Sequence, residues 1–190
     1  MTAIDAHPPR RAGLLALDAP LWSALESATT GLPGLVARLV FLLVLAPYYL
    51  ASALTKVGTG FPGILLPEAG AYVQILPGAM ERVGYDPSQI GLLGQVIVHA
   101  GTWAEFALPV LVVLGLLARW AALGMIGFVV VQSVVDVTGH GADAATVGAW
   151  LDRMPDAAIL DQRLLWAFVL GVIVLRGAGW LSLDRLLGRR

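Results

Sequence analysis

The stretch IGLLGQVIVHAGTWAEFALPVLVVLGLL, residues 90–117, decides the fold class of this protein. It is long enough to cross a bilayer, since a helix needs about 20 apolar residues to span the hydrocarbon core. Glu105, near its middle, is the only formally charged side chain in the run. A carboxylate at bilayer depth is costly, so such a residue usually faces a bundle interior or a wet cavity, where it is paired or protonated. Glu105 is therefore the first candidate for a functional residue.

The composition of the whole chain predicts an integral membrane protein. Its 190 residues are 58% hydrophobic and 13% charged, with a mean hydropathy of +0.80, whereas soluble domains carry roughly 25% charged residues. We therefore predict an all-α fold, a polytopic membrane four-helix bundle that forms a single domain over residues 35–187. The four predicted spans are residues 36–57, 90–117, 118–137 and 160–180.

The segments outside the spans are expected to be short and helical. Residues 1–34 are predicted to form a cytoplasmic segment, in which Asp18 and Pro20 begin a short interfacial helix; a floppy tail is the alternative. The loop between the first two spans and the loop over residues 140–161 are apolar and interrupted by proline and glycine. This pattern predicts short helices in the two outer loops, which would cap the outer face of the bundle.

The distribution of basic residues predicts the orientation of the bundle. With four spans both termini share one side, and under the positive-inside rule the more basic side is cytoplasmic. One side holds only Lys56, Arg82, Arg153 and Arg163. The side predicted to be cytoplasmic holds Arg10, Arg11, Arg38, Arg119, Arg176, Arg185, Arg189 and Arg190.

The chain contains no cysteine. This excludes disulfides, thiolate nucleophiles and Cys-ligated zinc or iron–sulfur clusters. Any redox role must therefore use a bound cofactor or a partner protein.

Polar and aromatic residues recur at helical spacing inside the spans. In the second span Gln95, His99, Thr102, Trp103 and Phe106 share a stripe flanked by Glu105. In the first span Tyr48 and Lys56 belong to a similar stripe. If these stripes face the bundle, its interior is polar and widens outward, with Glu105 deep inside. The predicted pocket or ligand-binding residues are Glu105, His99, Trp103, Gln95, Lys56 and Tyr48.

Each of these residues also has a structural interpretation. Gln95 can join helices by hydrogen bonding, His99 can make a structural hydrogen bond, and Lys56 can snorkel to the interface. A protonated Glu105 could donate to a neighbouring carbonyl. An indole beside Glu105 could pack against a flat cofactor such as a quinone, or Trp103 could fill core space.

Two further patterns suggest ligands or partners. Asp136 and His140 are four residues apart and could chelate a metal on one helical turn, although Gly139 and Gly141 indicate that the helix ends there. Ala121, Ala122, Gly124 and Gly127 form a small-residue face suited to helix contacts, which makes a homo-oligomer plausible. The expected surroundings are a lipid bilayer and other membrane or periplasmic proteins, with no nucleic acid.

The order of these features resembles the DoxX family of small four-helix bacterial membrane proteins. The resemblance lies in Arg38 and Lys56 at the two ends of the first span, in Trp103-Ala104-Glu105, and in the ending Gly177-Ala178-Gly179-Trp180-Leu181-Ser182-Leu183-Asp184. It implies that Glu105 and the residues Gly177, Gly179, Ser182 and Asp184 are family features. The ending also has a physical interpretation as a structural motif, because glycines end helices and Ser182 or Asp184 can cap a short following helix.

The resemblance implies a location in the bacterial inner membrane and an association with respiratory or quinone-linked systems, but no catalytic mechanism. We therefore consider first a non-catalytic or accessory subunit of a redox or quinone-linked membrane complex, with a quinone as the candidate cofactor. The alternatives are a small carrier for a proton, metal ion or small solute that uses Glu105, and a structural assembly factor. An independent enzyme is disfavoured by the lack of cysteine and of a dinucleotide fingerprint.

Overall fold

The computed structural model describes residues 23, 26 and 29–189, and its regular secondary structure is helical. The chain divides into two units, Met1–Thr30 and Gly31–Arg190. Apart from Ser23 and Glu26, the interfacial helix predicted from Asp18 and Pro20 lies outside the described residues. The architecture below is that of the second unit.

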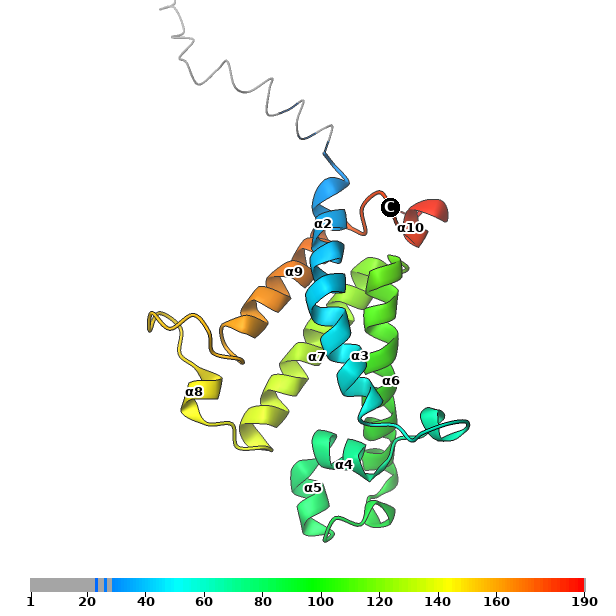
Figure 1. The fold of residues 1–190 in the computed structure, drawn as a ribbon, viewed down its shortest axis with the longest axis vertical. Coiled ribbons are helices and arrows are strands. Elements are labelled where there is room, and N and C mark those ends of the chain that lie inside the picture. The colour runs from blue at the N-terminus through cyan, green and yellow to red at the C-terminus, as the bar shows by residue number, and fades with distance from the viewer. Residues whose placement is uncertain (1–22, 24–25, 27–28, 190) are drawn as a thin grey trace, which may run out of the picture. The chain divides into compact units, whose positions relative to one another are not determined.

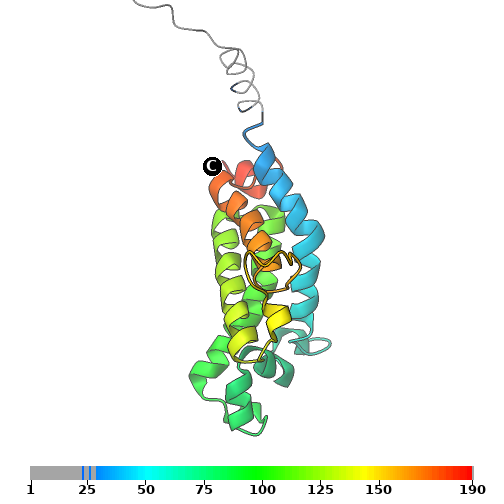
Figure 2. The same cartoon turned by 90° about the vertical axis from the view of Figure 1, so that its left-hand side faces the viewer.

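Four long helical segments run alongside one another in the second unit (Figures 1 and 2). The first consists of α2 (Leu32–Val40), the π-helical turn η2 (Phe41–Leu45) and α3 (Ala46–Leu54), which follow one another without a break. The others are α6 (Leu92–Leu114), α7 (Ala118–Thr138) and α9 (Gln162–Arg176). The short elements are η3 (Gly63–Leu65), α4 (Ala69–Ile75), α5 (Pro77–Arg82), η4 (Pro87–Gln89), α8 (Ala144–Val147) and α10 (Leu183–Leu186).

The first helix contains a wide turn just before its internal proline. In η2 the N–H of Ala46 bonds to the carbonyl of Phe41, five residues earlier. A π turn adds one residue to the helix and usually occurs as a single turn within an α-helix. Pro47 follows within the first turn of α3. Because proline has no N–H to donate, the wide turn lies where the continuous helix lacks one backbone hydrogen bond in any case.

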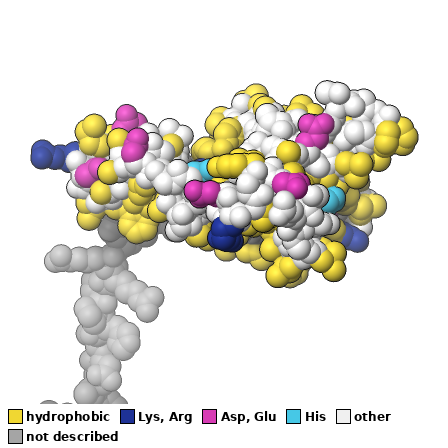
Figure 3. All heavy atoms as spheres, turned by 90° about the horizontal axis from the view of Figure 1, so that it is seen from below, with side chains coloured by type: hydrophobic (Ala, Val, Ile, Leu, Met, Phe, Trp, Pro, Cys, Tyr) yellow, Lys and Arg dark blue, Asp and Glu magenta, His cyan; other side chains and the backbone are white. Residues whose placement is uncertain are grey.

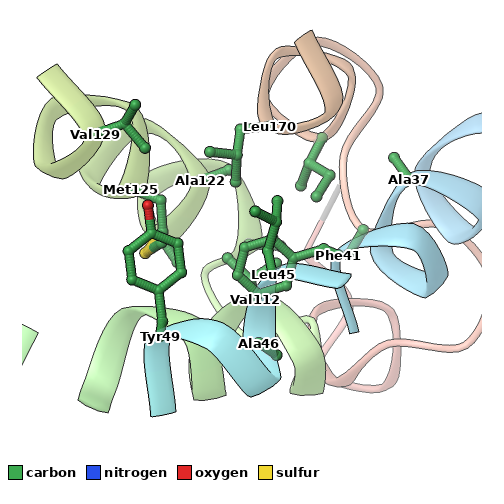
Figure 4. Packing of buried hydrophobic residues seen from close by; sticks show 14 residues of the cluster. Ala37, Phe41, Leu45, Ala46, Tyr49, Val112, Ala122, Met125, Val129 and Leu170 are labelled. Carbon is green, nitrogen blue, oxygen red and sulfur yellow. The ribbon is translucent and has the colours of Figure 1, made fainter. Parts of the chain in front are cut away.

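The core lies where the four segments meet. Aromatic and large aliphatic side chains from the first helix pack against small residues and Met125 of α7 and against Leu170 of α9 (Figure 4). Alanines on α7 let the helix backbones approach closely, so that Phe41, Leu45 and Tyr49 are almost fully buried. The buried members of this cluster are Ala37, Phe41, Leu45, Ala46, Tyr49, Val112, Ala118, Ala121, Ala122, Met125, Val129, Leu170, Ile173 and Ala178.

Three helices are long and apolar enough to cross a membrane: Leu32–Leu54, Leu92–Leu114 and Ala118–Thr138. The fourth predicted span, residues 160–180, is longer than the helix that forms there, because α9 has only 15 residues. At 1.5 Å per residue α9 is about 22 Å long, short of the roughly 30 Å hydrocarbon core. Gly177 follows α9 with φ +78° and ends it, so the run does not continue as a helix to Trp180.

Short helices do form in both outer loops, and those of the first loop pack against the bundle. Ala71, Tyr72, Met80, Ile90 and Val98 form a second apolar cluster, which joins α4 and α5 to the early turns of α6. Polar contacts complete this cap, because Gln74 Nε2 donates to Thr55 Oγ1 at 3.3 Å. His140 Nε2 lies 3.0 Å from the carbonyl of Gln74. The α4 segment therefore links the ends of the first helix and α7.

Candidate functional site

Glu105 and Lys56 form an ion pair inside the bundle. Glu105 lies on the buried face of α6, and its Oε2 is 2.7 Å from Lys56 Nζ. Lys56 follows the end of α3, where Nζ also donates to Ser52 Oγ at 2.9 Å and to the Ser52 carbonyl at 3.3 Å. The two residues are only 3% and 5% exposed. The charge of Glu105 is therefore neutralised by a partner from another helix, near the C-terminal, partially negative end of α3.

Two buried oxygens, one in the ion pair and one on a neighbouring residue of α6, lack regular hydrogen bonds. Thr102 Oγ1 and Glu105 Oε2 are buried and have no hydrogen-bond partner among the described residues. Thr102 and Glu105 are three residues apart, so their side chains lie on the same face of α6. The contact between Lys56 and Glu105 is therefore electrostatic rather than an aligned hydrogen bond, and a buried hydroxyl without a partner lies next to it.

A second ion pair joins α9 to α7. Arg163 Nη1 donates to Ser133 Oγ at 2.9 Å, and Arg163 Nη2 contacts Asp136 Oδ2. Arg163 is buried, whereas the side chain of Asp136 is partly exposed. Asp136 and Arg163 belong to the predicted spans 118–137 and 160–180, and their pairing was not predicted from the sequence. The available signal was that two opposite charges stand at the adjoining outer ends of consecutive apolar runs.

Aromatic rings and the amide of Gln132 pack between the first helix, α7 and α9. Gln132 Nε2 donates to the hydroxyl of Tyr48 at 2.8 Å, and the Tyr49 hydroxyl donates to Gln132 Oε1 at 3.5 Å. The Tyr48 and Tyr49 rings pack edge to face, 5.1 Å apart, and both contact Trp166. Tyr48 therefore belongs to a contact between the first helix, α7 and α9, rather than to the surroundings of Glu105.

Three of the predicted pocket residues lie on the outside of α6. Leu92, Gln95, Val96, His99, Ala100 and Trp103 line an open depression of about 450 Å³. Trp103 is 41% exposed, and its ring lies 6.0 Å from that of Phe106. His99 Nδ1 is 2.8 Å from the carbonyl of Gln95. The prediction that this stripe faces the bundle interior was wrong for Trp103.

The physical reason is a rotation about the axis of α6. The buried positions of α6 are Val98, Thr102, Glu105, Pro109 and Val112. His99 and Trp103 each follow one of these positions by one residue, and each residue turns the helix by about 100°. The six predicted residues therefore lie in three separate places. Glu105 pairs with Lys56, Tyr48 contacts Gln132, and Gln95, His99 and Trp103 line the depression on the exposed side of α6.

The predicted metal ligands have other partners. Asp136 contacts Arg163, and His140 contacts the Gln74 carbonyl. Across the described part of the chain, no three His, Cys, Asp or Glu side chains gather in a way that could hold a metal ion. A metal at Asp136 and His140 remains a prediction that no contact supports.

The small-residue face of α7 is largely used within the chain. Ala121 and Ala122 belong to the main core, and a Cβ on Gly124 would lie 3.1 Å from Leu108 Cδ2. Only Gly127 faces open space among these four residues. The face that suggested a homo-oligomer therefore mainly serves contacts between α7 and its own neighbours.

The C-terminal motif is built around Arg38. Its Nε donates to the Val112 carbonyl at 2.9 Å and its Nη1 to the Ala178 carbonyl at 2.8 Å; its two Nη groups also contact the carbonyls of Leu181 and Val113. Arg38 thus adds donors to carbonyls at the end of α6, including the Val112 carbonyl, which also accepts from Gly115 N–H. The same side chain holds the segment that follows α9.

The two polar residues of the motif cap two different helices. Ser182 Oγ accepts from Arg185 N–H at 3.2 Å, so Ser182 is the N-cap of α10. The two carboxylate oxygens of Asp184 accept from the N–H groups of Leu117 and Ala118, each at 2.8 Å. Asp184 therefore caps α7, a long-range contact that the sequence does not reveal.

Two glycines permit the close approach on which this motif depends. Gly179 has φ +78°, and a Cβ there would lie 2.5 Å from Leu35 N. Gly115 has φ +66°, and a Cβ there would lie 2.6 Å from Ser182 Cβ and 2.8 Å from Arg38 Cζ. Any other residue would meet both a strained backbone and a clash at these positions. With Gly177 ending α9, the motif acts as a structural clamp.

Long apolar helices around a paired, buried charge define a helical membrane protein. The chain belongs to the DoxX family, whose model matches residues 35–137, more than half of its length. The match includes Arg38, Lys56 and Glu105. Searches among curated proteins and among solved structures gave no match.

Proposed function

We propose that this DoxX-family protein is a non-catalytic accessory subunit of a redox or quinone-linked complex in the bacterial inner membrane. The observation that carries the proposal is the division of roles on α6. Glu105, its one charged residue, is paired with Lys56 inside the bundle, whereas His99 and Trp103 line a depression on the exposed side of α6. A ligand or partner would therefore be recognised by the exposed side of α6 rather than by the interior of the bundle.

The depression on the exposed side of α6 suits the ring of a lipid-soluble quinone or quinol. The carbonyl of Gln95 can only accept a hydrogen bond, so the Nδ1 of His99 at 2.8 Å must carry the proton. In the neutral imidazole the free Nε2 is then an acceptor, which suits the hydroxyl of a quinol; in the protonated imidazole it donates and suits the carbonyl of a quinone. The exposed face of Trp103 offers a surface for stacking.

The accessory role also fits what the sequence lacks. There is no cysteine for thiol-based redox chemistry. The G-x-G-x-x-G run Gly58–Gly63 lies in a loop and lacks the preceding strand and following helix that a dinucleotide site needs. The ligand or partner would supply the redox group, and this chain would position it. The proposal gives His99 and Trp103 binding roles and gives the Lys56–Glu105 pair a structural one.

For the topology we propose four crossings, with α9 as the fourth. Support comes from the packing of Leu170 and Ile173 of α9 in the main core with α2 and α7. The segment after Gly177 would complete the crossing on the cytoplasmic side, where the described arginines 119, 176, 185 and 189 lie. The end that carries α4 and α5 shows acidic and some basic side chains among apolar ones (Figure 3). The positive-inside rule counts lysine and arginine, and the chain has fewer of them on the side proposed to be outer, Lys56, Arg82, Arg153 and Arg163, than on the opposite side.

The test is native mass spectrometry of the full-length, gently extracted protein, with lipids, quinones and partner chains retained. We then add decylubiquinone, oxidised or reduced, to the wild type and to a His99→Leu/Trp103→Leu variant. The control is Phe168→Leu, which removes an exposed aromatic ring from α9. We expect the wild type and the control to retain the quinone or a redox partner, and the double variant to lose it. Equal retention by all three, or a protein with neither ligand nor partner, contradicts the proposal.

A carrier that uses Glu105 is the second candidate. The observation that favours it is the buried ionisable pair of Lys56 and Glu105, with the unbonded Thr102 Oγ1 three residues from Glu105 on the same face of α6. Proton uptake into proteoliposomes, followed with a pH-sensitive dye, distinguishes this candidate. Uptake that is lost in Glu105→Gln and kept in Asp136→Asn would favour the carrier; no uptake by the wild type would exclude proton transport.

A further inference from the structure

Three arginines meet at the junction where α6 passes into α7. Asp184 binds the N–H of Ala118, so Arg119 and Arg185, the residues that follow these two, are brought to the same place. The guanidinium of Arg119 lies over Gly177, where a Cβ would be 3.4 Å from its Nε and Nη2. Arg176 directly precedes Gly177 and is the last residue of α9. Figure 1 shows α10 at this end of the bundle.

The positive charges of this cluster are not balanced by ion pairs. Residues 29–189 contain two ion pairs, Lys56–Glu105 and Arg163–Asp136, and neither involves these arginines. The junction's own carboxylate, Asp184, already accepts from two backbone N–H groups. All three arginines are exposed. The backbone contacts therefore bring three exposed arginines to one corner of the fold, without an ion-pair partner among residues 29–189.

Large apolar side chains surround the cluster. Trp120, Leu181, Leu186 and Leu187 are between 63% and 82% exposed. They follow the arginines closely in the chain, so apolar and basic side chains alternate over a short surface. This combination is typical of segments at the membrane interface, where the apolar groups enter the acyl region and the charges meet the headgroups.

We propose that Arg119, Arg176 and Arg185 bind the phosphate group of an anionic phospholipid, with Trp120 and the three leucines against its glycerol and acyl chains. The planar guanidinium forms paired hydrogen bonds with phosphate oxygens, and several such groups are needed to hold a headgroup against water. The lipid would lie where the C-terminal clamp joins α6, α7 and α9. This site is independent of the redox role proposed above.

The experiment uses the full-length protein in micelles that contain equal amounts of phosphatidylglycerol and phosphatidylethanolamine, with the bound lipid read by native mass spectrometry. The test variant is Arg119→Gln/Arg176→Gln. The control is Arg82→Gln/Arg153→Gln, which removes the same charge from exposed positions, at the end of α5 and in the loop after α8, that have no ion-pair partner in the described chain. At roughly fivefold per arginine, we expect the test variant to lose phosphatidylglycerol about 25-fold relative to the control.

Other outcomes overturn the proposal. Equal retention of phosphatidylglycerol by the test and control variants would show that net charge, rather than this cluster, attracts the lipid. Displacement of the lipid by millimolar inorganic phosphate, with phosphate binding in the absence of lipid, would make the ligand a soluble phosphate compound. If the double variant does not fold, Arg185→Gln alone decides, with an expected loss of about fivefold; unchanged retention would contradict the proposal.

Discussion

Lys56, just beyond the end of α3, lies 2.7 Å from Glu105 on α6, and the two side chains are shielded from solvent by the bundle and the outer cap. Removing one partner of such a pair leaves an uncompensated buried charge, which costs about 3–5 kcal/mol. The first helix can therefore pack against α6 without this penalty only when both charges are present.

We expect Lys56→Met and Glu105→Gln each to lower the free energy of unfolding by about 3–5 kcal/mol, because each isolates the other charge. The double variant should cost much less than the sum of the two, since it isolates neither. Reversible unfolding in mixed detergent micelles measures all three values. Additive costs would show that the two side chains do not interact in solution.

We expect Arg38→Lys to lower the free energy of unfolding by about 1.5–3 kcal/mol, because charged hydrogen bonds to the carbonyls at the end of α6 are lost. Lysine keeps the charge but lacks the planar fork that reaches several carbonyls at once. Arg153→Lys is the matched control, since Arg153 is exposed. A variant as stable as this control would show that charge alone suffices at position 38.

The outer loops should respond to acid through Asp143. The backbone N–H of Thr146 holds the pKa of the Asp143 carboxyl below its usual value, since Asp143 is the N-cap of α8. A depressed pKa stabilises the loop above the ordinary pKa of aspartate, near 3.9, and this contribution is lost as the pH falls through the lower folded value. The Thr146 amide resonance should therefore titrate at a lower pH than an ordinary aspartate carboxyl.

The control for this titration is Asp143→Asn. Asparagine is a good N-cap without a titratable group, so the cap should persist while the pH response of the Thr146 amide disappears. An unchanged titration in Asp143→Asn would assign the response to another group.

The four-crossing topology is open to direct labelling, because the chain has no cysteine of its own. Single cysteines at Ala145, in the outer loop, and Arg189, beyond α10, occupy exposed positions. We expect an impermeant thiol reagent added to intact spheroplasts to label Ala145→Cys and to leave Arg189→Cys unlabelled until the membrane is opened. Labelling of both, or of Arg189→Cys only, would contradict the proposed orientation.

The all-helical class, the membrane setting and the family could be predicted from the sequence, because apolar length and composition determine which segments can leave water. The bounds of α9 could not, since Gly177 ends this helix inside an apolar run. Hydropathy alone does not identify such an end, because glycine is also tolerated within membrane helices.

The arrangement of the site was only partly predictable. Glu105 needed a partner on energetic grounds, and Lys56 was one of few basic residues on the side predicted to be outer. The inward face of α6 was not predictable from polarity, because the stripe with His99 and Trp103 and the stripe with Thr102 and Glu105 are both mixed. A Cβ on Gly94 would lie 3.3 Å from a methyl group of Leu76, and one on Gly101 would lie 3.3 Å from a methyl group of Ile75. The close packing of α4 against these glycines therefore helps to fix this face.

The π turn over Phe41–Leu45 sets the direction in which Lys56 leaves the first helix. One residue more or fewer in that turn would rotate every later residue of the helix by about 100° and shift it by about 1.5 Å along the axis. Deleting a single leucine there would turn the ammonium group away from Glu105 without changing either charged residue. An insertion or deletion in this turn can therefore make or break the ion pair, although the turn lies far from both charged residues.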